Sequence, residues 1–366
     1  MDKILVHNNW DPLEEIWLGD VWPESFYNDL TPELQDAFCK ITEWTKQDLA
    51  GIQQKLEEFD VVVHRPDVSG DKGKFIDSIT GKLLKPPICP RDNNAVVGNK
   101  LYFDDTNLYN AYKPLLDLYP KQNIIYNRHL SGAGTVKIGK DIIVDCPRGP
   151  GADGIFYTFR EFERAHQLLL NDYRIHFSTN GGHTDSCFMP LKEGLLLATE
   201  YWTDYDITLP DWKRIELLNP TYSGTKSGNY QESRWRVSGL KTPAHFNRYL
   251  ETYCKDWIGN YTETYFEVNV IMIDEKNMLC MGYHEELFRD LEKQGITCHV
   301  VPFRTRTFWD GGVHCVTLDI RRRAVMKDYF PERGNTGLNS FTDKIFPNKD
   351  SFLKEYNEWK LSKGFK

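Results

Sequence analysis

The sequence predicts an α/β fold, because amphipathic helical patterns repeatedly lead into short strands rich in β-branched residues. Three such pairs stand far apart in the 366 residues, at 33–59 and 61–66, at 159–170 and 173–177, and at 284–294 and 296–302. Each strand carries a histidine near its end, and these are His64, His176 and His299. The recurrence fits one repeated supersecondary unit and equally fits the general likeness of helices and strands in any α/β protein.

Local signals define the ends of these elements. Thr31 and Pro32 are typical of an N-cap and a first helical position, and Thr158 with Glu161 forms a capping box. Further strands are predicted at 95–98, 142–145, 194–199, 268–273 and 314–320. The polar stretch 202–242 indicates a surface insertion or lid. Because no linker divides the chain, we expect one domain over 1–330 and a polar, helical extension packed on it over 331–366.

Composition indicates a folded protein of the cytoplasm. Apolar residues make up 40% and charged residues 27%, and the net charge of -8 argues against nucleic acid as a partner. The N-terminus lacks the pattern of a signal or transit peptide, and no apolar run is long enough to cross a membrane. The eight cysteines are scattered without a metal-binding spacing, so free thiols and no metal are expected.

The motif "GGVHCVTLDIRRR" (311–323) places Cys315 behind two glycines at the start of a predicted strand. Strand alternation would turn His314 away from Cys315, so a proton-transfer partner must come from elsewhere. "NGGHTDSC" (180–187) provides His183 and Asp185, which the same alternation would place on one face. "PPICPRDNNAVV" (86–97) adds Asp92 at the edge of another predicted strand.

These residue types suit a guanidinium substrate. Two carboxylates can bind the planar cation through its N–H groups, and a thiolate can attack the central carbon. A histidine can protonate the departing amine and later deprotonate the next nucleophile. Each residue alone has a structural explanation, since a lone cysteine is most often a small buried hydrophobe and a lone histidine a structural residue. Their joint presence favours a catalytic site.

Four segments resemble the amidinotransferases, the group of glycine and inosamine amidinotransferases, in the usual order. They are "PRDNNAVVGNK", "GGHTDSCFMPLKEGLLLAT", "VNVIMIDEKNMLCM" with "LEKQGITCHVVPFR", and "GGVHCVTLDIRRR", within a likeness that extends from about residue 5 to 330. The resemblance implies a pseudo-fivefold α/β propeller, or pentein, of ββαβ units around a central channel. It also implies that Cys315 is the nucleophile, that His183 is the general acid and base, and that Asp92 and Asp185 hold the guanidinium, with no cofactor.

The chain departs from the family pattern at two places. Ser131 stands where the family has the acid that pairs with the catalytic histidine, and Gly134 replaces a second aspartate. His183 should therefore be less basic than usual. Three consequences stay open, which are compensation by Asp145 or Asp153, slow or altered chemistry, and loss of catalysis.

The second departure concerns the substrate carboxylate. Trp202 stands near the position of the family's carboxylate-binding arginine, which leaves Arg304 and Arg306 as substitutes.

The function expected is amidino transfer from arginine or an arginine-like donor to an amine, through a thiouronium on Cys315. A guanidino hydrolase of the deiminase or dihydrolase type and a non-catalytic guanidinium-binding protein are the alternatives. A papain-like protease is disfavoured, because there the cysteine precedes the histidine. The expected partners are the small-molecule donor and acceptor, with a homodimer as the candidate assembly.

Overall fold

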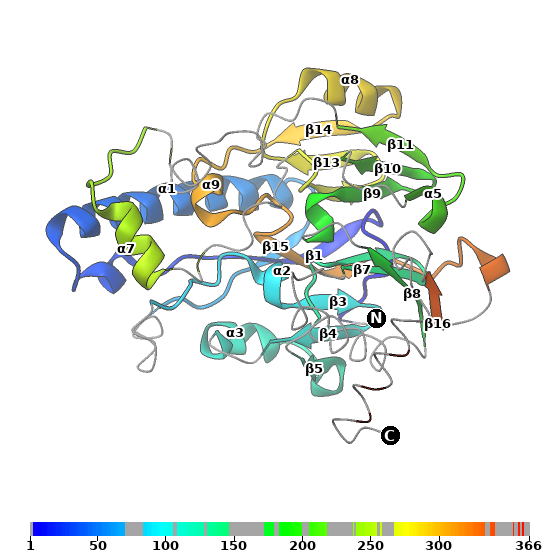
Figure 1. The fold of residues 1–366 in the computed structure, drawn as a ribbon, viewed down its shortest axis with the longest axis horizontal. Coiled ribbons are helices and arrows are strands. Elements are labelled where there is room, and N and C mark those ends of the chain that lie inside the picture. Colours follow the sequence, from blue (N-terminus) through cyan, green and yellow to red (C-terminus); the bar gives the residue numbers. More distant parts are fainter. Residues whose placement is uncertain are drawn as a thin grey trace.

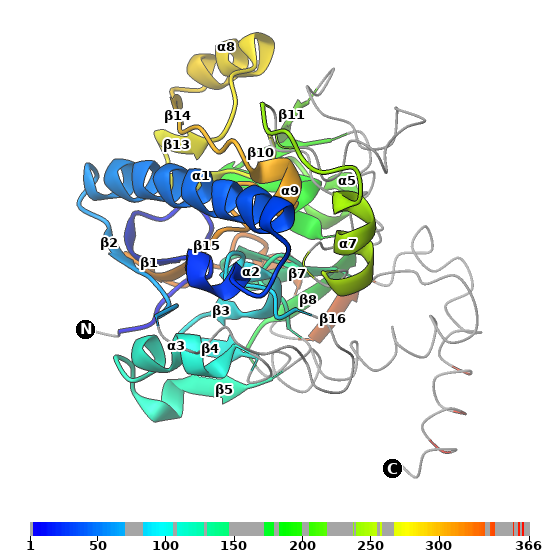
Figure 2. The same ribbon diagram turned by 90° about the vertical axis from the view of Figure 1, so that its left-hand side faces the viewer.

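The chain is built from short strands gathered in small sheets, with helices on the outside, as the computed structural model shows (Figure 1). Helices α3 (Tyr109–Leu116) and α8 (Glu285–Lys293) lie at opposite edges in both views, and α1 (Pro32–Glu57) runs across the face that Figure 2 turns toward the viewer. The residues described by the structure are 3–69, 83–104, 108–127, 130–145, 172–178, 183–199, 205–217, 237, 239–254, 257, 267–333, 337–340, 354, 358 and 361.

Five sheets within the described residues share one strand order. A first strand pairs antiparallel with a second, and the second pairs parallel with a third. Parallel neighbours need a crossover, which α1, α3, α5 (Tyr205–Thr208) and α8 provide in four of the units. The strands, in the order first, second and third, are β15 (Thr317–Arg322), β1 (Leu13–Leu18) and β2 (Val62–His64); β3 (Ala95–Val97), β4 (Lys100–Phe103) and β5 (Ile124–Tyr126); β6 (Thr135–Ile138), β7 (Asp141–Asp145) and β8 (Arg174–Ser178); β9 (Phe188–Lys192), β10 (Leu195–Ala198) and β11 (Lys213–Glu216); and β12 (Ile271–Asp274), β13 (Asn277–Cys280) and β14 (Thr297–Val300).

The three histidines noted in the sequence occupy one repeated position. Each lies on the third strand of its unit, and its Nε2 contacts a side-chain oxygen on the second strand. In every case this oxygen belongs to a second-strand residue that is paired, in the strand register, with the residue two positions before the histidine. Repetition of one unit is thereby confirmed over chance likeness. The pairs are His64 with Glu15 at 3.1 Å, His176 with Asp141 at 2.6 Å, and His299 with Asn277 at 3.0 Å.

The ends of the chain meet in one unit. Strand β15 pairs antiparallel with β1, in a register that sets Leu18 opposite Thr317 and Leu13 opposite Arg322. This unit thus combines β15, a strand late in the sequence, with the early elements β1, α1 and β2. This pairing completes the set of five ββαβ units.

Helix α1 packs one face against the largest core cluster. Its side chains Phe38, Ile41 and Leu49 are fully buried, and each contributes roughly 1.5–3 kcal/mol by leaving water. Thr31 is the N-cap residue and Pro32 opens the helix, as predicted, although the Thr31 hydroxyl makes no capping hydrogen bond. Its place beside β1 and β2 fixes the unit that contains Cys315.

Several boundaries differ from the prediction. The strands predicted to start at 268 and 314 begin at Ile271 and Thr317. The stretch 202–242 contains α5 and β11, so its described part is not an irregular insertion. After residue 330, β16 (Gly337–Ser340) pairs with β8, and the described residues beyond it, Lys354, Glu358 and Leu361, are helical. The helix predicted at 159–170 lies outside the described residues. In the described part of the chain, the helices lack the combined length and apolar character that a membrane crossing requires.

Candidate active site

The candidate site is assembled from the segments that precede the first strand of each unit. Asp92 lies on α2 (Pro90–Asn93) before β3, Ser131 before β6, and Asp185 on the 3-10 turn η4 (Thr184–Ser186) before β9. Asn269 stands before β12 and Cys315 before β15. Hydrogen bonds between neighbouring segments join them, so five distant parts of the sequence meet at one end of the first strands.

Cys315 and His314 lie on a turn that ends where β15 begins. Strand alternation therefore does not apply to them, and the prediction that His314 points away was wrong. His314 Nδ1 is 2.7 Å from Asp185 Oδ2, and Cys315 Sγ is 3.8 Å from the same oxygen. Both side chains thus face one carboxylate, which the prediction had paired with His183.

Burial sets the protonation of His314. It lowers the pKa of this imidazole to about 4, helped by the positive charge of Arg91 and opposed by Asp185. The ring is therefore neutral at pH 7, and its Nδ1–H donates to the Asp185 carboxylate. This bond fixes the position of Asp185 beside the thiol.

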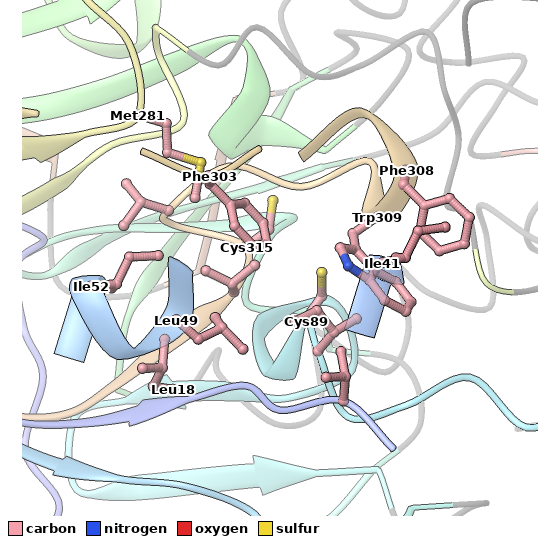
Figure 3. Packing of buried hydrophobic residues seen from close by; sticks show 14 of the residues in the cluster. Leu18, Ile41, Leu49, Ile52, Cys89, Met281, Phe303, Phe308, Trp309 and Cys315 are labelled. Carbon is pink, nitrogen blue, oxygen red and sulfur yellow. The ribbon is translucent and has the colours of Figure 1, made fainter. Parts of the chain in front are cut away.

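The Cys315 thiol is buried among apolar side chains such as Leu18, Leu49 and Phe303 (Figure 3). Burial raises its pKa well above the ordinary value, and the negative charges of Asp185 and Asp92 raise it further. The sulfur is thus a thiol when no cation is present. Neutralising the two carboxylates would favour the thiolate.

Each of the two predicted carboxylates has an oxygen available for a ligand. Asp92 Oδ1 and Asp185 Oδ1 are buried, and neither has a hydrogen-bond donor among the described residues. The second oxygen of Asp92 lies 3.5 Å from Lys85 Nζ, and that of Asp185 accepts from His314. A buried carboxylate oxygen without a donor is unfavourable by roughly 1–3 kcal/mol, which a bound N–H group would relieve.

Arg91 binds the backbone of the turn that carries Cys315. Its Nε donates to the carbonyl oxygens of His314 and Thr317 at 2.8 and 2.9 Å, and its Nη2 pairs with Asp319. Burial alone would raise the pKa of Asp319, but Arg91 and Arg322 hold it well below the ordinary value. Of the three arginines in the motif, Arg322 is therefore a buried framework residue.

The glycines of the motif permit close packing around Cys315. A Cβ on Gly311 would stand 3.0 Å from Cys89 Sγ and 3.3 Å from Cys315 Cβ. A Cβ on Gly312 would stand 2.3 Å from Asn269 Oδ1, which no side chain there could allow without displacing the amide. Glycine at 312 is thus required by the approach of Asn269.

Ser131 hydrogen-bonds to its own loop. Its Oγ accepts from the backbone N–H of Ala133 and Gly134 at 3.2 and 3.3 Å, and lies 3.5 Å from the carbonyl oxygen of Arg91. Among the described residues, Ser131 therefore does not pair with the His183 imidazole. Of the compensating acids considered, Asp153 lies outside the described residues, as does the side chain of Asp145.

His183 is placed by a turn, which corrects the strand assumed in the prediction. It is the N-cap of η4, and its carbonyl oxygen accepts from Ser186 N at 3.1 Å. The backbone of Asp185 donates to the Ala133 carbonyl at 3.0 Å, so this turn is fixed against the loop that carries Ser131.

The two arginines predicted to bind the substrate carboxylate have different partners in the structure. Arg304 is held by helix α1, with its Nε 2.9 Å from Asp48 Oδ1 and its guanidinium over the Trp44 ring. The structure thus assigns Arg304 to an ion pair with α1. Arg306 Nη1 donates to the Met281 carbonyl at 3.1 Å, and both arginines line one surface pocket with Tyr283. Trp202 lies outside the described residues.

Sequence reasoning missed Asn269, whose amide contacts both the backbone and the sulfur of Cys315. The available signal was its place in "VNVIMI" (268–273), where it is the one polar side chain within a predicted apolar strand. In the part of the chain that the structure describes, no group of His, Cys, Asp and Glu side chains has a geometry suited to a metal.

No family model matches the chain. Among curated proteins, mitochondrial glycine amidinotransferase of Xenopus laevis is 24% identical over 88% of this chain and 84% of its own length. Inosamine-phosphate amidinotransferase 1 of Streptomyces griseus is 22% identical over 88% of this chain and 98% of its own.

Two solved structures share the fold. An amidinotransferase of saxitoxin biosynthesis from Microseira wollei has a TM-score of 0.60 and 20% identity, covering 90% of this chain and all of its own. Inosamine-phosphate amidinotransferase from Streptomyces griseus has a TM-score of 0.59 and 19% identity, covering 90% of this chain and 99% of its own. In sequence and in fold, this pseudo-fivefold α/β propeller, or pentein, is therefore similar to the amidinotransferases.

Proposed function

We propose that the chain transfers an amidino group from arginine or an arginine-like donor to an amine acceptor, through a covalent adduct on Cys315. The observation that carries the proposal is the pair of buried, donor-free oxygens on Asp92 and Asp185, beside a thiol 3.8 Å from Asp185. A guanidinium has the planar N–H groups that would satisfy both oxygens. The names of the similar proteins point to the same chemistry.

In the first half-reaction the donor guanidinium binds between the two carboxylates. Its positive charge neutralises the field that keeps Cys315 protonated, so the thiolate becomes accessible when substrate arrives. His183 takes up the thiol proton, and the sulfur attacks the central carbon and forms a C–S bond. The C–N bond to the departing amine then breaks, and His183 supplies the proton that this amine needs.

In the second half-reaction the acceptor amine takes the place of the released product. It attacks the thiouronium carbon, and His183 removes a proton from the attacking nitrogen. The C–S bond breaks, which returns Cys315 and releases the new guanidino compound. We propose that Arg306 binds the carboxylate of an amino-acid substrate, because Arg304 is already paired with Asp48. Trp202 stays a candidate for contact with the acceptor.

Ser131 distinguishes this proposal from a full copy of the family site. Ser131 supplies no negative charge to stabilise imidazolium at His183, so proton transfer by His183 should be slower than with a carboxylate at position 131. We therefore propose an active transferase with a weakened base.

The test is intact-mass measurement of the protein after incubation with arginine and acid quench. The expected adduct adds an amidino group, about 42 Da, to wild type and nothing to Cys315→Ser. Ornithine should be released catalytically only when an amine acceptor is added. Release of citrulline or ammonia from arginine, with no acceptor added, would show that the protein is a hydrolase and not a transferase. Binding of labelled arginine without formation of an adduct would show that the protein binds guanidinium compounds without catalysis.

A further inference from the structure

Asn269 occupies, in the fifth unit, the position from which the other four units supply the site. Asp92, Ser131, Asp185 and Cys315 stand two to four residues before the first strands of their units, and Asn269 stands two before β12. Its side chain is fully buried. The Asn269 amide therefore lies where the other units place their site residues, although the proposed reaction gives it no role.

The carboxamide of Asn269 contacts the nucleophile at three points. Its Oδ1 accepts from the backbone N–H of His314 at 3.0 Å and from that of Cys315 at 3.1 Å. Its Nδ2 donates to Cys315 Sγ at 3.0 Å. Two backbone donors on one atom identify that atom as the oxygen, so the N–H group must face the sulfur.

This N–H donor opposes burial and the two carboxylates, as does the backbone N–H of Gly312. Asp185 and Asp92 both disfavour a negative sulfur, as does burial. Among the described residues, the Asn269 amide is the side chain that donates an N–H to Sγ. A thiolate accepts such a bond more strongly than a thiol does, because the bond is then charge-assisted.

We propose that Asn269 is a positioning residue with two separable tasks: its oxygen holds the Cys315 turn, and its N–H stabilises the sulfur anion. Cys315 is taken as the nucleophile here, so the inference rests on the proposed function. Gly312 belongs to the same device, because any side chain there would displace the Asn269 oxygen.

The variant Asn269→Asp separates the two tasks. It keeps an oxygen for the two backbone N–H groups and replaces the donor to sulfur by a second oxygen. Alkylation of Cys315 by iodoacetamide, followed by peptide mass mapping between about pH 6 and pH 10, reports the thiolate directly. Because the pKa of Cys315 is already well above its ordinary value, the readout is the rate below the midpoint, and we expect that rate to fall about tenfold or more at each pH.

Two further variants keep the test decisive. Asn123→Asp makes the same chemical change at a partly exposed position on another unit, and should leave the alkylation profile unchanged. Gly312→Ala pushes the amide aside and should reproduce the fall in rate, whereas Asn269→Asp leaves the backbone N–H of Gly312 beside the sulfur and so isolates the effect of the amide. Should Asn269→Asp fail to fold, Gly312→Ala still answers the question.

An alkylation profile in both Asn269→Asp and Gly312→Ala equal to that of wild type would overturn the inference. The readout needs no guanidino substrate, so it is independent of amidino transfer. A shifted profile in a protein that never forms the arginine adduct would leave Asn269 in its role and refute the proposed function. In an active enzyme, kcat should fall about tenfold or more in Asn269→Asp while KM changes little.

Discussion

Asp185 and His314 are joined by a 2.7 Å hydrogen bond between Oδ2 and Nδ1, although 129 residues separate them in the sequence. The bond fixes one face of the carboxylate and leaves its Oδ1 without a donor among the described residues. A neutral imidazole thus orients the anion that we propose for guanidinium binding. The pairing makes His314 part of the site, although strand alternation had excluded it.

Acid should destabilise the protein through His314. The folded pKa of about 4 lies below the ordinary 6.5, so the unfolded chain binds the extra proton first. Stability is therefore lost as the pH falls from about 6.5 to 4, by about 3 kcal/mol in all. His314→Asn, which can still donate to Asp185, should lose less over this interval. Urea unfolding at several pH values measures this, and equal losses in both proteins would contradict the assignment.

Ser131→Asp should raise or preserve the rate. The new carboxylate can accept the N–H groups of Ala133 and Gly134 that now bond to Ser131 Oγ, so the loop should persist. A negative charge at this position should also raise the pKa of His183. Ornithine release against pH, with Ser131→Ala as the control, measures both effects. Complete loss of activity in Ser131→Asp alone would mean that the site is built around serine.

Arg304→Ala should leave the KM for guanidino donors unchanged. Its guanidinium pairs with Asp48 on α1 and its side chain is 41% exposed, so the loss of stability should be about 1 kcal/mol. Arg306→Ala is the matched comparison and should raise the KM for substrates that carry a carboxylate. A large KM effect at Arg304 with none at Arg306 would reverse these assignments.

Lys137→Met should stabilise the protein at neutral pH. Lys137 is buried on β6, and burial lowers its pKa to about 8, with further lowering by Arg91 and Arg322. The unfolded chain therefore binds this proton more tightly, and stability rises with pH between about 8 and 10.5. Removing the amine should add about 1–3 kcal/mol at pH 7 and much less at pH 10. An equal change at both pH values would show that packing, not charge, is responsible.

The repeated unit and most of the proposed site could be predicted from local patterns. Amphipathic helices before β-branched strands located α1, β2, α8 and β14, because helix and strand periods are visible within a dozen residues. Glycine pairs drew attention to Cys315 and Asp185, since close approach of the backbone needs glycine.

The remaining features depend on contacts that no local pattern records. Asn269 meets Cys315 across 46 residues, and Arg91 meets His314 across 223. The same contacts explain why β15 starts later than predicted. The N–H groups of His314 and Cys315 bond to Asn269 Oδ1, so they are not available to a neighbouring strand.

The pairing of β15 with β1 has a consequence for folding. The surroundings of Cys315, which we propose as the nucleophile, form only once β15 docks onto β1, a strand far from it in the sequence. Such closure between distant segments is slow, because loop entropy must be overcome before the contacts form. Appearance of activity during refolding should accordingly trail the burial of the tryptophans.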